Sequence, residues 1–361
     1  MHRQVAAHLA FSVPVFSAVA AMALACESPG PSSAPAASTS PIATPAADTS
    51  ASDGSAPEAP EWLRFETPAD AAPADVEALP LSPFRADELA TDVAKRTDVA
   101  SAITHHRRTV VVAETFVLAM ADEAAPIDAA ADTVRRETAF LWRGIFARRL
   151  YEGVTVWVYG ARDAYERDRE KWGPPGSVAS DLSFYDPETR TIWFCAAGSG
   201  LGTLGHEVVH PLLQGYGDGD FPHAPTWLSE GLSALFEIVT YDDKTGEAQF
   251  GPHFRIVSLR KALKRTEYAP KVSLEHLFTL RDDRSFKEDR ALAYALSREA
   301  LRFMHEKHGD ALWRFYRSFR DGVLTDPTGE RAFAASMDGK TPADVTPEFL
   351  AWVQSSESGP L

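Results

Sequence analysis

The 361-residue chain contains only two cysteines, Cys26 and Cys195. If Cys26 is modified, as argued below, Cys195 has no partner within the chain, and no internal disulfide is expected. An oxidising compartment is therefore permitted, although the fold would not depend on it. Cys195 stands among Trp193, Phe194 and Ala196 and is most simply read as a buried apolar side chain.

Positive charge is also scarce, since 36 Lys and Arg residues face 51 Asp and Glu residues, for a net charge of −15. An acidic surface argues against non-specific binding to nucleic acids or anionic lipids, so no nucleic-acid partner is expected. The sequence shows no glycine-rich phosphate loop, no cysteine metal knuckle and no internal repeat. About 250 residues from position 109 onward suffice for one domain with a sizeable core.

A long apolar run occurs near the N-terminus, at residues 9–25, after a start that carries Arg3. A charged start, an apolar middle and small residues before a cleavage point are typical of a secretory signal rather than a membrane span. Residues 23–26, Ala-Leu-Ala-Cys, resemble a bacterial lipobox, although Ala23 stands where leucine is more usual. We expect residues 1–25 to be a lipoprotein-type signal peptide and the product to be an exported cell-envelope lipoprotein, anchored to the membrane through Cys26. The alternatives are simple cleavage near Ala25 and an uncleaved N-terminal anchor.

Large apolar side chains are almost absent from residues 26–60, which are rich in Ser, Ala and Pro. Such a segment cannot bury enough surface to offset its ordering entropy, so a disordered tether is expected. Residues 61–104 mix apolar residues with acidic and proline-rich stretches. They are expected to wrap the following domain without forming its core.

The periodicity of apolar residues changes along the rest of the chain and predicts its secondary structure. We expect strands at 109–119 and 154–159, helices at 127–150 and 161–172, and a hairpin at 182–196 that turns at Asp186-Pro187-Glu188-Thr189. A polar loop is expected at 241–253, and further helices at 227–237, 254–265, 272–280, 289–307 and 310–320.

The most informative stretch is residues 205–210, Gly-His-Glu-Val-Val-His. On a helix, His206 and His210 lie one turn apart and can direct two imidazole nitrogens at one metal ion. Glu207 then lies beside the pair, free to polarise a metal-bound water, as in zinc peptidases. A catalytic zinc keeps three protein ligands and one open position, and Glu230, twenty positions after His210, is the candidate third ligand.

The motif His-Glu-Val-Val-His followed by Trp-Leu-Ser-Glu-Gly at 227–231 resembles the gluzincin metallopeptidases, particularly the peptidase-MA-like domains of secreted bacterial proteins. The resemblance is specific over about residues 200–240 and looser over 105–325. It implies His206, His210 and Glu230 as Zn²⁺ ligands and Glu207 as general base. It further implies an α+β, two-lobed zincin domain over 105–325, in which an N-terminal mixed sheet carries the motif helix and a helical lobe follows. Residues 326–361 would then be a C-terminal segment.

One departure from the family pattern is Pro211, directly after the second histidine. Proline lacks the amide hydrogen, clashes with the carbonyl four residues back and disfavours helical geometry at the residue before it. We therefore expect the motif helix to kink or end early, with an effect on the presentation of His210.

Further residues have two readings each. In several gluzincins a tyrosine or histidine of the helical lobe donates to the oxyanion, so Tyr294 is either a catalytic donor or a helix-packing side chain. Glu237 either orients a ligand histidine or is a partly exposed carboxylate. One arm of the 182–196 hairpin either binds the substrate backbone at a free edge or is an interior strand. His223, in the loop between the two metal helices, either contacts the substrate or the metal or is a solvent-facing loop histidine. The remaining histidines singled out are assigned to the surface: His105, His106, His305 and His308.

The leading hypothesis is a zinc-dependent metalloendopeptidase that hydrolyses peptide or protein substrates through a zinc-bound water activated by Glu207. The alternative from another class is a catalytically inactive, zincin-like binding or scaffold lipoprotein at the cell surface. The same metal centre can also hydrolyse bonds other than peptides.

Overall fold

The computed structural model describes residues 83–174, 182–215, 219–242 and 244–359. The predicted signal peptide, Cys26, the tether and residues 61–82 lie outside these ranges. Within the described ranges, no helix is both long and apolar enough to cross a membrane.

A five-stranded mixed sheet has the order β1-β2-β3-β5-β4. The strands are β1 (Thr109–Val112), β2 (Phe116–Met120), β3 (Val154–Tyr159), β4 (Ser183–Asp186) and β5 (Thr191–Cys195). β2, β3 and β5 run parallel, while β1 and β4 pair antiparallel with β2 and β5. The β4–β5 hairpin predicted at 182–196 and the strand at 154–159 are confirmed.

The single strand predicted over 109–119 is wrong, because the segment is a hairpin. Ala113 and Glu114 turn between β1 and β2 with φ of 51° and 57°. Such a left-handed turn is usually marked by Gly, Asn or Asp, and neither residue gives that signal.

Alternate residues of the strands point to opposite faces of the sheet. Phe116 and Leu118 pack into the main core with α2 (Ile127–Trp142) and α4 (Ala196–Leu213). Val117 and Ala119 pack instead against Leu89, Val93 and Ala100 of α1 (Pro83–Ile103). Part of the segment expected only to wrap the domain therefore contributes to a core.

Two predicted helices flank this sheet. α3 (Arg162–Trp172) lies within the range predicted at 161–172. α2 ends at Trp142 rather than at residue 150. Gly144 has a φ of 136°, a conformation that cannot belong to a right-handed helix. Ile145 and Phe146 are nevertheless buried in the turn that follows. Buried apolar residues beyond the helix end made the predicted helix too long.

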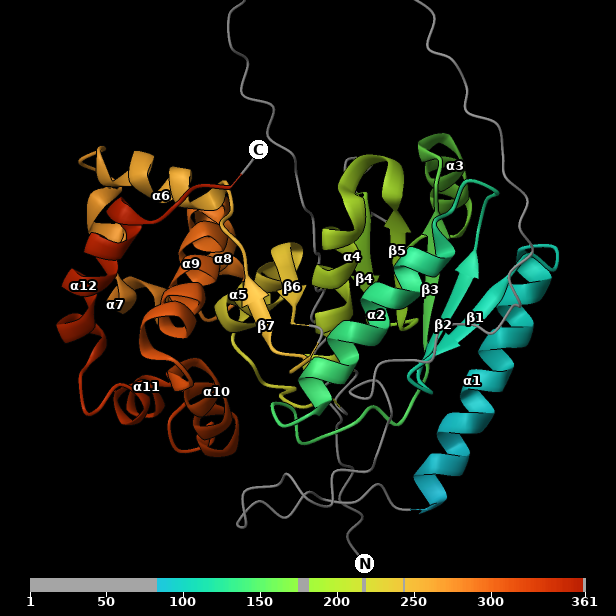
Figure 1. Ribbon diagram of the computed structural model, residues 1–361, viewed down its shortest axis with the longest axis horizontal. Helices are drawn as coiled ribbons and strands as arrows, with labels where there is room; N and C mark the ends of the chain where they lie inside the picture. Colours follow the sequence, from blue (N-terminus) through green and yellow to red (C-terminus); the bar gives the residue numbers. More distant parts are fainter. Residues whose placement is uncertain (1–82, 175–181, 216–218, 243, 360–361) are drawn as a thin grey trace, which may run out of the picture.

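The second half of the described chain is mainly helical and lies beside the sheet in Figure 1. It contains α5 (Thr226–Leu235), η2 (Phe236–Ile238), β6 (Val239–Tyr241), β7 (Ala248–Phe250), α6 (Arg255–Leu263), η3 (Ala269–Lys271), α7 (Leu274–Leu277), α8 (Asp283–Glu288), α9 (Arg290–His308), α10 (Ala311–Gly322), α11 (Glu330–Ser336) and α12 (Pro342–Ser355). The predicted helices at 254–265, 289–307 and 310–320 correspond to α6, α9 and α10, and that at 272–280 shortens to α7. The loop expected at 241–253 instead contributes to the β6–β7 hairpin.

The sheet part and the helical part are tied together by the buried side chain of Asp220. Its Oδ1 accepts hydrogen bonds from the backbone amides of Ala147 and Arg148, at 2.7 and 2.8 Å. Its Oδ2 accepts from the hydroxyl of Tyr316 on α10, at 2.6 Å. Asp220 thereby connects the turn after α2 with α10.

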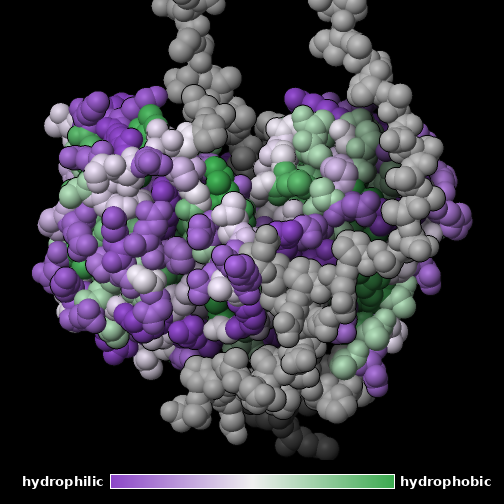
Figure 2. All heavy atoms as spheres, viewed as in Figure 1, coloured by the Kyte–Doolittle hydropathy of each residue, from purple (hydrophilic) through white to green (hydrophobic). Residues whose placement is uncertain are grey.

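The whole arrangement confirms the mixed α+β composition expected from the sequence. α11 and α12 follow the predicted end of the domain at residue 325, yet Phe333, Val345 and Phe349 belong to the same main core as α2 and α4. Hydrophilic residues cover most of the helical part in Figure 2.

Candidate metal centre

Helix α4 carries the whole 205–210 motif and is bent at Gly200, whose φ of 71° and ψ of 169° are not helical. Beyond this bend the helix presents His206 and His210 one turn apart, with their ring centroids separated by 5.1 Å. Both rings are buried. The bend therefore lies well before the two histidines.

The expected kink or early end at Pro211 is wrong. α4 continues to Leu213, and the amide of Gln214 donates to the carbonyl of His210 at 2.9 Å. Pro211 lies within the last turn, so its missing amide removes one helical hydrogen bond, to the carbonyl of Glu207, and ends nothing. His210 therefore keeps helical backbone geometry.

Gly205 allows α4 to approach its neighbours closely. A Cβ atom at this position would lie 2.3 Å from Oε1 of Glu137 on α2 and 2.9 Å from the carbonyl oxygen of Phe236 in η2. Both distances are shorter than a carbon–oxygen contact allows. Gly205 therefore lets α4 pack closely against Glu137 and the backbone of η2.

Helix α5 brings Glu230 to the two histidines. Its Oε2 lies 3.4 Å from Nε2 of His206 and 3.8 Å from Nε2 of His210. One donor atom from each of the three residues lies within 4.8 Å of the others, and all three residues are buried. These three atoms have no hydrogen-bond partner among the described residues. Buried polar atoms without partners are costly, so the group has the composition and geometry to hold a metal ion.

The other ring nitrogen of each histidine has its own partner. Oε1 of Glu237 lies 3.0 Å from Nδ1 of His206. Glu237 belongs to η2, because α5 ends at Leu235 rather than at Glu237 as predicted. Its side chain is only 13% exposed, so of the two predicted readings the contact with the histidine is confirmed.

His210 has neutral partners instead. Nδ1 of its ring lies 3.3 Å from Oγ of Ser229 and 3.5 Å from Oγ of Ser233. Sequence analysis missed both serines. Their positions immediately before Glu230 and one turn later are the signal that could have indicated them.

Burial and neighbouring charges shift the pKa values of His206, His210 and Glu230 in different directions. Burial acts to lower the pKa of His206, but Glu230 and Glu237 more than offset it and raise this pKa to about 10. For His210, burial dominates and lowers the pKa to about 4. Burial acts to raise the pKa of Glu230, but the two histidines lower it to about 2. The group therefore favours an ionised carboxylate with one neutral and one proton-bearing histidine before a metal binds.

Glu207 is fully buried beside this group, and neither of its carboxylate oxygens has a side-chain hydrogen-bond partner among the described residues. Burial is the main cause that raises its pKa to about 8, and the backbone amide of Tyr185 acts in the opposite direction. Tyr185 belongs to β4, the last strand on its side of the described sheet. Of the two arms of the hairpin, β4 is thus the one at an edge.

Tyr294 of α9 is close to the same group. Its ring centroid lies 6.4 Å from that of His206, and its hydroxyl faces Glu230 and helps to lower the pKa of that carboxylate. The ring also packs edge-on against Phe286, at 4.9 Å. The position suits both predicted readings of Tyr294.

The histidines predicted to lie at the surface differ in their exposure. His105 and His106 are exposed, as predicted, and His223 is exposed as well. His305 and His308 are half-buried instead, because their rings pack on Phe250 and Phe303. Cys195 is buried, as predicted.

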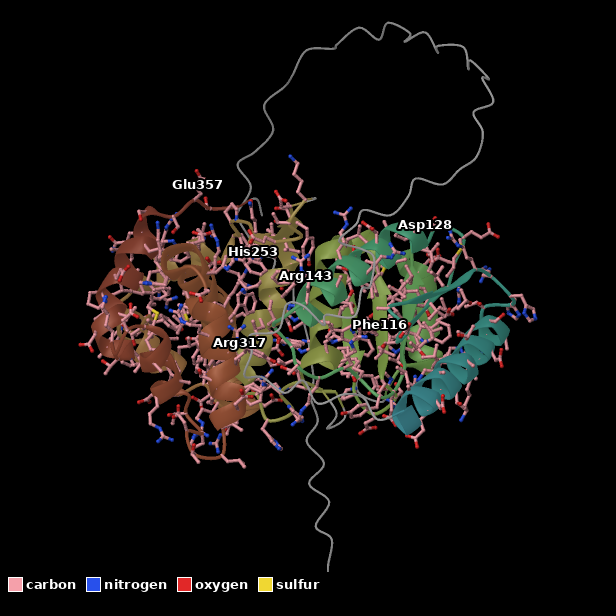
Figure 3. All side chains as sticks on the ribbon, turned by 60° about the horizontal axis from the view of Figure 1, so that its bottom comes forward. Phe116, Asp128, Arg143, His253, Arg317 and Glu357 are labelled. Carbon is pink, nitrogen blue, oxygen red and sulfur yellow. The ribbon has the colours of Figure 1, made fainter. Side chains whose placement is uncertain are left out.

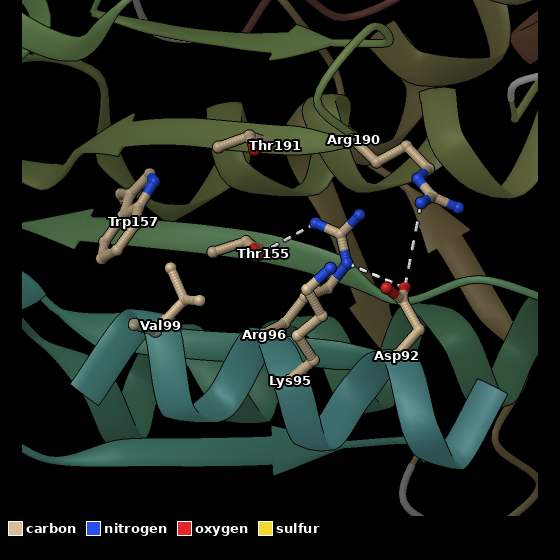
Figure 4. A pocket seen from close by; sticks show the side chains of 9 residues that line it. Asp92, Lys95, Arg96, Val99, Thr155, Trp157, Arg190 and Thr191 are labelled. Carbon is tan, nitrogen blue, oxygen red and sulfur yellow. Dashed lines mark hydrogen bonds and ion pairs between the residues drawn. The ribbon is translucent and has the colours of Figure 1, made fainter. Parts of the chain in front are cut away.

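A separate cavity of about 330 Å³ lies between α1 and strands β3 and β5 (Figure 4). Its two arginines are already paired: Nε of Arg96 lies 2.9 Å from Oδ2 of Asp92, and Arg190 pairs with Glu152. Arg96 also donates to Oγ1 of Thr155 at 3.2 Å. With these charges satisfied, we assign the cavity no ligand.

The fold and this group together define a mixed α+β protein with a buried His206–His210–Glu230 group that could hold a metal ion. A family model described as "Protein of unknown function (DUF1570)" matches residues 200–321, from the bend of α4 to α10. The matched range includes the three candidate ligands. It also includes Glu207, Glu237 and Tyr294. No curated protein matches the chain.

Proposed function

We propose that the protein is a zinc metallopeptidase of the gluzincin type, which hydrolyses peptide bonds in peptide or protein substrates. The observation that carries the proposal is the placement of Glu207, a fully buried carboxylate whose pKa is raised to about 8 mainly by burial, next to the three convergent ligand atoms of His206, His210 and Glu230. A purely structural carboxylate at this depth normally pairs with a side chain, because burial of an uncompensated charge is costly, and Glu207 has no such side-chain hydrogen bond among the described residues.

The donor set favours zinc. Two imidazole nitrogens and one carboxylate oxygen are the ligands of many catalytic zinc sites, which keep a fourth position open. When bound, zinc supplies a Lewis acid that polarises a carbonyl and lowers the pKa of water to about 7. His206 must first give up the Nε2 proton that its raised pKa indicates, so metal binding should release a proton.

The remaining catalytic roles are assigned to residues of the chain. Glu207 accepts a proton from the attacking water and returns it to the leaving amine. It needs to be ionised for this role, and a cation held by its neighbours would lower its raised pKa in that direction. Tyr294 is the proposed donor to the oxyanion, and β4 is the proposed strand on which the substrate backbone aligns.

We further propose that the protein is exported and anchored through a lipid on Cys26, as the N-terminal sequence predicts. Mass spectrometry of the mature N-terminus should find diacylglycerol on this cysteine. An unmodified N-terminus elsewhere would refute the anchor without affecting the metal site.

The test of the enzyme proposal is a Glu207→Gln variant, assayed for zinc content and for hydrolysis of a broad peptide library. We expect about one zinc per chain in both proteins and hydrolysis only by the wild type, since glutamine keeps the shape but cannot accept the proton. Zinc binding without hydrolysis by the wild type would favour the alternative, a non-catalytic binding or scaffold protein. One ground for that alternative, a distortion at Pro211, is weakened because α4 continues past this residue.

A further inference from the structure

The two carboxylate oxygens of Glu237 face in different directions. Oε1 lies 3.0 Å from Nδ1 of His206. Oε2 lies 3.0 Å from Nε2 of His253 and forms an ion pair with the guanidinium of Arg255. One carboxylate thus connects a candidate metal ligand on α4 with two residues that come from the loop after β7 and from the start of α6.

The hydrogen-bond directions along this connection can be assigned. The backbone amide of Arg255 donates to Nδ1 of His253 at 3.2 Å. A neutral His253 must then carry its hydrogen on Nε2, where it can donate to Glu237. Burial is the main cause that lowers the pKa of His253 to about 4, in keeping with a neutral ring at pH 7. His253, labelled in Figure 3, lies where the helical part meets the sheet part.

Arg255 also reaches the second branch of the site. Its guanidinium carbon lies 5.4 Å from the centroid of the Tyr294 ring, within the range of a cation–π contact. The hydroxyl of the same tyrosine faces Glu230. A single arginine, with a side chain only 10% exposed, therefore contacts the partners of two candidate ligands.

We propose that Arg255, together with His253, is a positioning residue for the metal centre: it holds Glu237 so that His206 directs Nε2 at the metal. The inference rests on the proposed function, because it assumes that a metal binds between His206, His210 and Glu230. The physical basis is that a buried carboxylate needs a counter-charge, and Arg255 supplies one to Glu237 in addition to the proton-bearing His206. Without Arg255, the carboxylate loses part of its charge compensation and one of the two partners that orient Oε2. Among the described residues, the partners of Nδ1 of His210 are instead the neutral hydroxyls of Ser229 and Ser233.

The experiment measures the zinc dissociation constant of the purified chain by competition with a chromophoric chelator. Arg255→Gln should weaken zinc binding by roughly 10- to 100-fold, the range for lost partners of metal-bound histidines. Arg255→Lys keeps the charge but not the planar fork, so it should recover part of the loss. Arg290→Gln is the matched control, since Arg290 lies 5.5 Å from the same Tyr294 ring, and it should leave the constant nearly unchanged.

The melting temperature, with and without zinc, separates positioning from simple folding stability. A merely structural role would lower both melting temperatures equally and leave the zinc affinity as in the wild type, which would overturn the inference. A positioning role shrinks the increase that zinc produces, because stabilisation by a ligand follows its affinity. His253→Ala, measured in the same way, should also weaken zinc binding and decides the matter if Arg255→Gln does not fold. If the wild type binds no zinc, the proposed function itself fails.

Discussion

The hydroxyl oxygen of Ser229 lies 3.3 Å from Nδ1 of His210, so the residue before one candidate ligand in the chain supports another. Ser233, one turn later on α5, approaches the same nitrogen at 3.5 Å. His206 is instead supported by the carboxylate of Glu237. Hydrogen bonds to a charged group are about twice as strong as neutral ones, so His206 is the more firmly held of the two.

Removal of both serine hydroxyls should therefore weaken the metal site, but less than the loss of charge around Glu237. We expect the double variant Ser229→Ala, Ser233→Ala to bind zinc about 10-fold more weakly, at the low end of the range for such partners. Chelator competition measures the change. Ser297→Ala is the control, since Ser297 is a buried serine of α9 whose hydroxyl has no partner among the described residues. An unchanged affinity in the double variant would show that the serines do not orient His210.

Much of this site could be predicted because its chemistry is local. His206, Glu207 and His210 lie within one and a half helical turns, and the spacing alone brings them together. Glu230 required only a second helix at a suitable distance. The contacts of Glu237 with His253 and Arg255 depend instead on how η2 and α6 pack against α4, and no periodic pattern contains that information.

The fold was predictable to a similar degree. The parallel strands β3 and β5 have continuous apolar runs and were expected, as were α6, α9 and α10. The β1–β2 turn was missed because Ala113 and Glu114 adopt positive φ without the usual turn residues. The contribution of α1 to a core was missed because only Leu89, Val93 and Ala100 of its apolar residues are buried in that core, while Val99 and Ile103 are exposed.

Glu137 of α2 should make the metal-free protein less stable as the pH rises. Its side chain is buried, its Oε2 has no partner among the described residues, and burial raises its pKa well above the usual value. Above the unfolded pKa of 4.5 the folded state holds a proton that the unfolded state has lost, so the free energy of unfolding falls as pH increases.

A Glu137→Gln variant removes this titration. Its stability relative to the wild type should therefore increase between pH 5 and pH 8, by at most about 1.4 kcal/mol per pH unit. Urea unfolding of the metal-free proteins at several pH values measures the difference. Glu123→Gln, at an exposed site, is the control for the loss of one negative charge. A difference that stays constant with pH would mean that Glu137 is ionised in the folded protein.

The close approach of α4 to α2 and η2 should make Gly205 intolerant of any side chain. Gly205→Ala would place a Cβ atom 2.9 Å from the backbone carbonyl oxygen of Phe236 and 2.3 Å from Oε1 of Glu137, and the backbone contact can be relieved only if α4 or η2 shifts. We expect a loss of about 1–3 kcal/mol in the free energy of unfolding, the usual effect of overpacking. Gly322→Ala at the end of α10 is the matched control, because its Cβ would meet no atom within 4 Å. Equal effects of the two substitutions in urea unfolding would contradict the proposed role of Gly205.

A substitution at Tyr294 can distinguish a catalytic role of this residue from a packing role. Tyr294→Phe keeps the ring that packs against Phe286 and removes only the hydroxyl that faces Glu230. If this hydroxyl donates to the oxyanion, kcat measured at saturating zinc should fall by about 100-fold or more while KM changes little, because the interaction forms only in the transition state. The control is Tyr316→Phe, whose hydroxyl binds Asp220 instead, and which should lower stability without a selective loss of kcat. A Tyr294→Phe variant with full kcat would leave the tyrosine as a packing residue, and the oxyanion donor would then have to be sought among other groups that face Glu207.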